Sequence, residues 1–236
     1  MAPKRADTRM GAVITVGHPP IEITVRRKKN ARRLTLRLAT DGVYLTLPNR
    51  TPLKEAEAFA HKQEAWLRDK LAKRPASQSV KETGTLPVLG APRTLAQGTG
   101  RVCRLDGSTL YVPGPRERHS AKIKAFLKET ARAHLTRASD TYAAMVDVPY
   151  SKITLRDTRS RWGSCTSSGN LMYSWRLIMA PPEVLDYVAA HEVAHLVELN
   201  HSPRYWAVVA RICPDYPVHR RWLRQNGAAL HGIKFD

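Results

Sequence analysis

The stretch His191-Glu192-Val193-Ala194-His195 decides the interpretation of this chain. Residues four apart in an α-helix lie on one face, one turn above each other. His191 and His195 can therefore direct two imidazoles at one metal ion. Glu192 lies about 100° round the helix from His191, because a helical turn holds about 3.6 residues. A carboxylate there does not join the ligand pair but can contact a water on the metal, which is the position of a general base.

A catalytic zinc site takes three protein ligands and leaves a fourth position for water. His201 is the candidate for the third ligand, but on a straight helix it would lie about 280° round from His191 and about 9 Å beyond His195. The helix must therefore end before His201. Asn200 is suited to a left-handed C-terminal cap, and Ser202-Pro203 is suited to the start of a new helix. The pattern predicts one zinc ion per chain, held by the three histidines.

Other interpretations of this pattern remain open. Two histidines at this spacing can also be ordinary residues on one face of an amphipathic helix, with no role in metal binding. A structural zinc usually has four ligands, commonly with cysteine, and the nearest thiols, Cys165 and Cys213, lack the usual paired spacing. The spacing H-E-x-x-H-x5-H equals that of metzincins, but Glu198 replaces their turn glycine and no Met-turn follows. Glu198 is either a residue that orients a histidine or a solvated surface residue.

Further motifs surround this stretch and together resemble a known family. They are Arg161-Trp162-Gly163-Ser164-Cys165, Trp175-Arg176-Leu177-Ile178 with Ala180-Pro181, Tyr187-Val188, His191 to His195, Asn200-His201-Ser202 and Trp206. With the basic stretch Arg26 to Arg33 and the Trp66-Leu67 helix, they resemble the YgjP-like, SprT-related zinc metallopeptidases. The resemblance covers most of the chain after about Ile21. It implies a zincin-like domain with His191, His195 and His201 as zinc ligands and Glu192 as catalytic base, and it does not identify the protein or peptide substrate.

Bulk composition bounds the class of protein. A chain of 236 residues can hold one large domain or two small ones. Three cysteines at wide spacing argue against a disulfide framework and favour a reducing compartment. The sequence has no run of about 18 apolar residues, so no membrane span is predicted, and residues 1–15 lack the apolar segment of a secretory signal. The composition therefore predicts a cytoplasmic protein with no membrane partner.

The formal net charge of +19 is the unusual bulk feature. Such a charge suits a polyanionic partner such as nucleic acid, or an acidic substrate, and it also suits simple solubility. One stretch concentrates the charge, and it can be a nucleic-acid-binding patch or only the tip of a charged hairpin. The candidate nucleic-acid-binding residues are Arg26, Arg27, Lys28, Lys29, Arg32 and Arg33.

The periodicity of the chain predicts an α+β fold with three regions. Residues 1–11 form a disordered basic tail. Residues 12–114 form an antiparallel β-rich region with one helix, in which alternating leucines at 34, 36 and 38 mark a half-buried strand and Thr51-Pro52 begins the helix. Residues 115–236 form the zincin-like metallopeptidase domain. Its strands 152–157 and 171–179 form a hairpin beside the metal-binding helix, with an edge that can pair with an extended peptide.

Three functions compete on the sequence alone. The leading one is a zinc endopeptidase, in which Glu192 takes a proton from a zinc-activated water. The second is a peptidase that acts on DNA-bound proteins, which the charge and the SprT relationship favour and which salt-dependent DNA binding would test. The third is a nonenzymatic, metal-stabilised binding protein, which Glu192 disfavours because a purely structural site needs no base.

Overall fold

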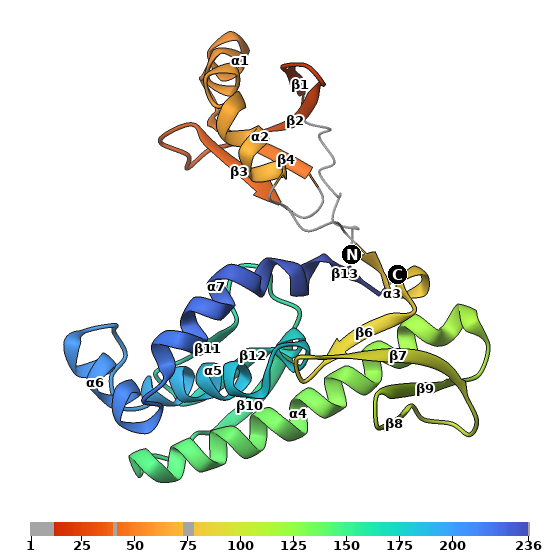
Figure 1. Ribbon diagram of the computed structural model, residues 1–236. Helices are drawn as coiled ribbons and strands as arrows, with labels where there is room; N and C mark the ends of the chain where they lie inside the picture. The colour runs from red at the N-terminus through yellow and green to blue at the C-terminus, as the bar shows by residue number, and fades with distance from the viewer. Residues whose placement is uncertain (1–11, 40–41, 73–77, 236) are drawn as a thin grey trace, which may run out of the picture. The chain divides into compact units, whose positions relative to one another are not determined.

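The computed structural model describes residues 12–39, 42–72 and 78–235, and the chain forms two compact units, residues 1–74 and 75–236 (Figure 1). The predicted α+β class is confirmed, since both units combine helices with small sheets. The predicted tail at residues 1–11 lies outside the described residues. No helix in the described ranges is long and apolar enough to cross a membrane.

The first unit is built on a four-stranded sheet in the order β1-β2-β4-β3. The strands are β1 (Val13–Val16), β2 (Ile21–Lys28), β3 (Thr35–Ala39) and β4 (Gly42–Pro48). The expectation of a wholly antiparallel region is wrong, because β2 and β4 pair in parallel. The chain passes from β2 to the outer strand β3 and returns between them as β4, so β4 runs antiparallel to β3 and in the same direction as β2.

Two helices, not the single predicted one, cover one face of this sheet (Figure 1). Helix α1 (Leu53–Lys62) ends at Gln63, whose φ of −95° and ψ of 4° are not helical, and α2 (Glu64–Ala72) follows. The break allows Ala56 of α1 and Leu67 of α2 to share one core with strand residues such as Leu45. A straight helix would have carried part of this apolar stripe away from the sheet.

The second unit contains a further four-stranded sheet in the order β6-β7-β9-β8. Its strands are β6 (Thr85–Val88), β7 (Ala91–Gly98), β8 (Arg104–Asp106) and β9 (Thr109–Pro113), and β7 and β9 are parallel. The sequence assigned these strands to the N-terminal region, but they share the core of the second unit. The Leu89 N–H donates to the Ile178 carbonyl at 2.7 Å. The packing therefore separates the units at residues 74 and 75 rather than at 114 and 115.

Helices form the body of the second unit (Figure 1). They are α3 (Val80–Thr83), the 3-10 turn η1 (Arg116–Arg118), α4 (His119–Val146), α5 (Pro182–Ala194), α6 (Pro203–Ile212) and α7 (Tyr216–Gly232), with a two-stranded pairing of β5 (Gln78–Ser79) and β13 (Ile233–Lys234). Helix α4 buries Ile123, Leu127, Ala131 and Leu135 at intervals of one turn. This stripe packs in one core with α5, most of whose residues are buried.

A three-stranded sheet in the order β10-β12-β11 lies next to α5. It comprises β10 (Lys152–Arg156), β11 (Gly163–Cys165) and β12 (Asn170–Ser174). The predicted strand 171–179 stops at Ser174, and residues 175–179 form the 3-10 helix η2. Trp175, Leu177, Ile178 and Met179 are all buried, whereas a strand sends neighbouring side chains to opposite faces. The predicted hairpin of residues 152–157 with 171–179 is wrong, because β10 runs parallel to β12; β12 forms its hairpin with β11. Strands β10 and β11 are therefore the two edges of the sheet, and β11 is the edge that contacts α5.

Candidate metal centre

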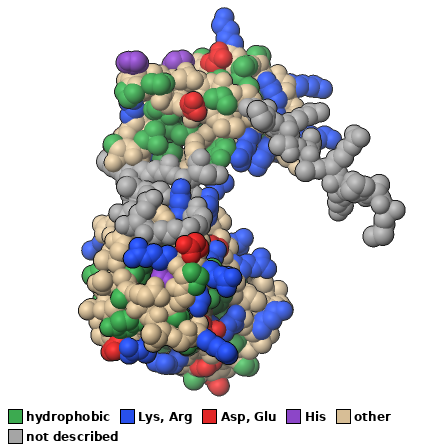
Figure 2. Space-filling view, turned by 90° about the vertical axis from the view of Figure 1, so that its right-hand side faces the viewer, with side chains coloured by type: hydrophobic (Ala, Val, Ile, Leu, Met, Phe, Trp, Pro, Cys, Tyr) green, Lys and Arg blue, Asp and Glu red, His purple; other side chains and the backbone are tan. Residues whose placement is uncertain are grey.

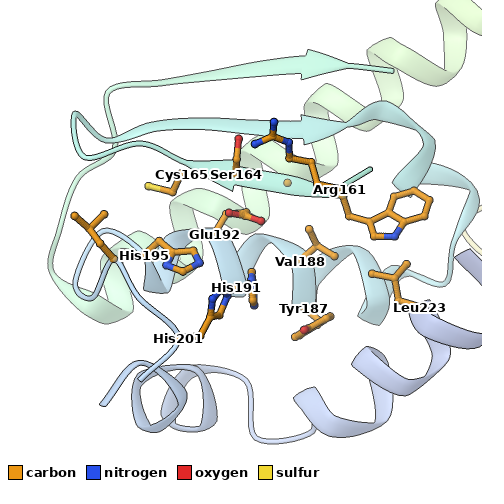
Figure 3. Close-up of a pocket in the computed structure, with 13 residues that line it drawn as sticks. Arg161, Ser164, Cys165, Tyr187, Val188, His191, Glu192, His195, His201 and Leu223 are labelled. Atoms are coloured by element: carbon orange, nitrogen blue, oxygen red, sulfur yellow. Dashed lines mark hydrogen bonds between the residues drawn. The ribbon is translucent and has the colours of Figure 1, made fainter. Parts of the chain in front are cut away.

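Three histidines converge in the second unit (Figure 3). The ligand atoms of His191, His195 and His201 all lie within 4.8 Å of one another, and the Nε2 atoms of His191 and His201 are 3.2 Å apart. Nitrogens of a tetrahedral zinc site lie about 3.4 Å apart, given Zn–N distances of about 2.0–2.1 Å. The structure therefore brings together the three residues that the sequence predicted, and the His191–His201 pair has the spacing of two zinc ligands.

The break after α5 carries His201 to the other two histidines. Helix α5 ends at Ala194, earlier than the sequence indicated, and His195 is its C-terminal cap. Asn200 does not adopt the predicted left-handed conformation. Its side-chain oxygen instead accepts the Ser202 N–H at 2.9 Å. The prediction for the next helix is confirmed, because Ser202 is the N-cap of α6 and its hydroxyl accepts the Tyr205 N–H at 3.3 Å.

Burial favours the neutral form of two imidazoles, those of His191 and His195, and metal coordination requires that form. Burial, together with the nearby His195, His201 and Arg220, lowers the pKa of the His191 imidazole to about 3. Burial also lowers the pKa of His195. The ring of His195 is oriented by its Nδ1–H, which donates to the Glu198 carbonyl at 3.0 Å and leaves Nε2 free to bind a metal. Glu198 thus orients a histidine through its backbone and not through its carboxylate.

Two aromatic residues of α6 hold the histidines in place. Tyr205 is fully buried, donates its hydroxyl to the His191 carbonyl at 2.8 Å and stacks on the His195 ring at 4.4 Å. The Trp206 ring lies against His191 and His201. The Arg220 guanidinium lies over the Trp206 ring, 4.6 Å from its centroid. The Tyr205 hydroxyl is therefore a support for α5.

Glu192 is buried beside the histidines, with 4% of its surface exposed. Its side chain packs on the backbone of β11 at Gly163, where a Cβ would lie 2.6 Å from the Glu192 Cγ and would also collide with its carboxyl (Figure 3). Burial raises the pKa of the Glu192 carboxyl to about 8, against the opposing effect of Arg161. A carboxyl with a pKa near neutrality is suited to accept and return a proton.

Replacing Gly163 with alanine should therefore displace the Glu192 carboxyl without touching a histidine. We expect metal content to persist and the hydrolysis predicted from the sequence to fall by roughly 10²-fold, because a displacement of about 1 Å can cost that much. Gly107→Ala is the control for a general loss of stability. Its φ of +53° makes the substitution strained, but the added Cβ meets no atom within 4 Å and so does not contact Glu192. Equal hydrolysis by the two variants, at equal melting temperature, would contradict this role of Gly163.

A cleft of about 410 Å³ lies between β11 and α5. Residues 161–165 form one wall, and the other wall holds the histidines, Glu192 and apolar side chains from α5 and α7. Trp162 fixes the first wall to α7, since its ring stacks on His231 at 4.6 Å and a Cβ on Gly227 would lie 2.9 Å from it. The motif around Trp162 thus positions the strand that covers Glu192.

The six predicted nucleic-acid-binding residues belong to the first unit, whereas the three histidines belong to the second. Arg27 stabilises the turn after β4, because its guanidinium donates to the carbonyls of Asn49 and Thr51, each at 2.7 Å. Arg26 lies over the Tyr44 ring at 3.7 Å. The remaining four are exposed: Lys28, Lys29, Arg32 and Arg33.

A helix that carries H-E-x-x-H, a third histidine after a chain reversal and an edge strand across the cleft define a metallopeptidase domain of the zincin-like class. The sequence model of the YgjP-like metallopeptidase domain matches residues 32–226, so the chain belongs to the YgjP-like metallopeptidase family. No curated protein and no solved structure gave a significant match.

Proposed function

We propose that this protein is a zinc-dependent peptidase that binds one zinc ion per chain through His191, His195 and His201 and uses Glu192 as general base. One observation carries the proposal: the three ring nitrogens converge within 4.8 Å in the same cleft as a buried carboxyl. A site that only stabilised the fold would not need that carboxyl. The raised pKa of Glu192 shows that burial opposes ionisation of its carboxyl. Carboxyl groups with strongly shifted pKa values cluster at functional sites.

The reaction proposed is hydrolysis of a peptide bond. Zinc, when bound, lowers the pKa of water to about 7 and polarises the scissile carbonyl. Glu192 accepts the proton of the attacking water and then delivers it to the leaving amine. Arg161 lines the cleft and is the best-placed donor for the oxyanion, because Tyr205 donates to a backbone carbonyl and Asn200 caps the turn before α6.

The substrate proposed is an extended segment of a peptide or unfolded protein. Strand β11 pairs with β12 on one side only and forms a wall of the cleft. An extended peptide can add to such an edge through main-chain hydrogen bonds, which bind many sequences.

The three cysteines are unpaired, which agrees with the proposed cytoplasmic location.

Removal and return of zinc tests this function. The purified protein should contain one zinc per chain by elemental analysis and should cleave an unfolded protein such as reduced, carboxymethylated albumin. Dialysis against a chelator should abolish cleavage, because the His nitrogens alone cannot activate water, and stoichiometric zinc should restore it while magnesium should not. Cleavage that persists after the zinc has been removed would refute the proposal.

A further inference from the structure

The first unit presents a sheet face that its helices do not cover. Along β2, the side chains of Ile21, Ile23 and Val25 are buried in the core with α1 and α2. Neighbouring side chains of a strand point to opposite faces. The outward face of β2 therefore carries Glu22, Thr24, Arg26 and Lys28. The same alternation on β4 buries Val43, Leu45 and Leu47 and sends Tyr44 and Thr46 outward.

Register places cationic and aromatic side chains side by side on this face. Tyr44 of β4 pairs with Thr24 of β2 on one side and with Arg37 of β3 on the other. The Arg26 guanidinium lies over the Tyr44 ring, 3.7 Å from its centroid. The two central strands thus carry a stacked cation and ring, with Lys28 further along β2.

Cations predominate on this face. Lys29, Arg32 and Arg33 follow β2 and are exposed, and they continue the line of cations beyond the sheet. Glu22 is the one acidic residue within the four strands, and the same alternation places it on this face, at the end of β2 opposite Lys28. Figure 2 shows the same excess over the surface in view, where blue Lys and Arg side chains greatly outnumber red Asp and Glu.

We propose that this face, defined by Arg26, Lys28, Arg37 and Tyr44 and called here the open sheet face, binds single-stranded nucleic acid. Flat aromatic rings and guanidinium planes bind unpaired bases by stacking, and nearby cations bind the phosphates. A duplex buries its bases and offers nothing to stack on Tyr44. Insertion into a lipid surface would need apolar side chains, and Val13 is the one large exposed apolar residue in the strands of this unit. The proposal concerns the first unit and does not depend on peptidase activity.

The test measures binding of the full-length, zinc-loaded protein to a fluorescein-labelled single-stranded oligothymidine of about 20 nucleotides. Binding is followed by anisotropy from low to moderate salt. The first variant replaces Arg26, Lys28 and Arg37 with serine. Its matched control replaces Lys54, Lys62 and Lys70 with serine, which removes the same charge from α1 and α2. A third variant, Tyr44→Leu, keeps an apolar side chain but removes the ring, and circular dichroism checks that each variant is folded.

We expect the triple variant of the open sheet face to bind at least about tenfold more weakly and to flatten the salt slope by about 2, since each single-strand phosphate contact contributes about 0.7. Tyr44→Leu should weaken binding by about 5- to 100-fold with little change in slope, because a stacked base is lost. The helix-side control should retain the wild-type slope. Equal losses in both triple variants, an unchanged slope in the first, or tighter binding to a duplex or to phosphatidylserine vesicles would each overturn the proposal.

Discussion

Substituting Glu192 by glutamine should leave zinc bound and lower the rate of peptide hydrolysis by roughly 10²–10⁴-fold, the range for loss of a general acid–base group. Glutamine keeps the length and planar end of the side chain, so it fits the space that Gly163 leaves against β11. It cannot take up a proton at neutral pH. The substitution therefore removes the proposed chemistry while the three histidines remain in place.

A neighbouring glutamate supplies a matched control for this experiment. Glu198→Gln makes the same chemical change close to the metal centre, but Glu198 orients His195 through its backbone carbonyl, which the substitution preserves. Both variants should be assayed for zinc by elemental analysis and for cleavage of the unfolded substrate over a range of pH. If Glu192→Gln cleaves as fast as Glu198→Gln, with zinc present in both, Glu192 is not the base.

Substituting His201 by alanine should strip the metal. Loss of residues that merely support metal ligands costs about 10–100-fold in affinity, so loss of a ligand should exceed that range. The two remaining histidines lie on one helical turn and cannot complete the site. We expect zinc to be absent after mild chelation that leaves the wild-type protein loaded, and peptide hydrolysis to be lost with it.

The control for this prediction is His134→Ala, which removes a histidine on α4 that lies outside the cluster of three. Competition with a chromophoric chelator gives the affinity of each variant, and circular dichroism reports whether the fold persists without zinc. Zinc at full stoichiometry and wild-type affinity in His201→Ala would mean that another residue is the third ligand. Loss of zinc in both variants would point to a general effect on the fold.

Local pattern was enough to predict which three histidines the structure brings together. The spacing of His191 and His195 depends only on helical periodicity, and the start of α6 depends on the chemistry of Ser202-Pro203, so neighbours in the sequence determine both. The resemblance in motifs likewise led to the family that matches residues 32–226. The pairing of β2 with β4 could not be read in the same way, because strand direction depends on which strands become neighbours.

Only the tertiary structure decided what surrounds these residues. Gly163 is 29 positions before Glu192, and nothing in its sequence surroundings says that its missing side chain makes room for a carboxyl. The roles of Tyr205 and of the Glu198 carbonyl also follow from packing between segments that the chain brings back together. The sequence by itself predicted which groups are the candidates for binding a metal and moving a proton. Long-range packing determined how those groups are oriented and buried, because orientation and desolvation belong to contacts between distant parts of the chain.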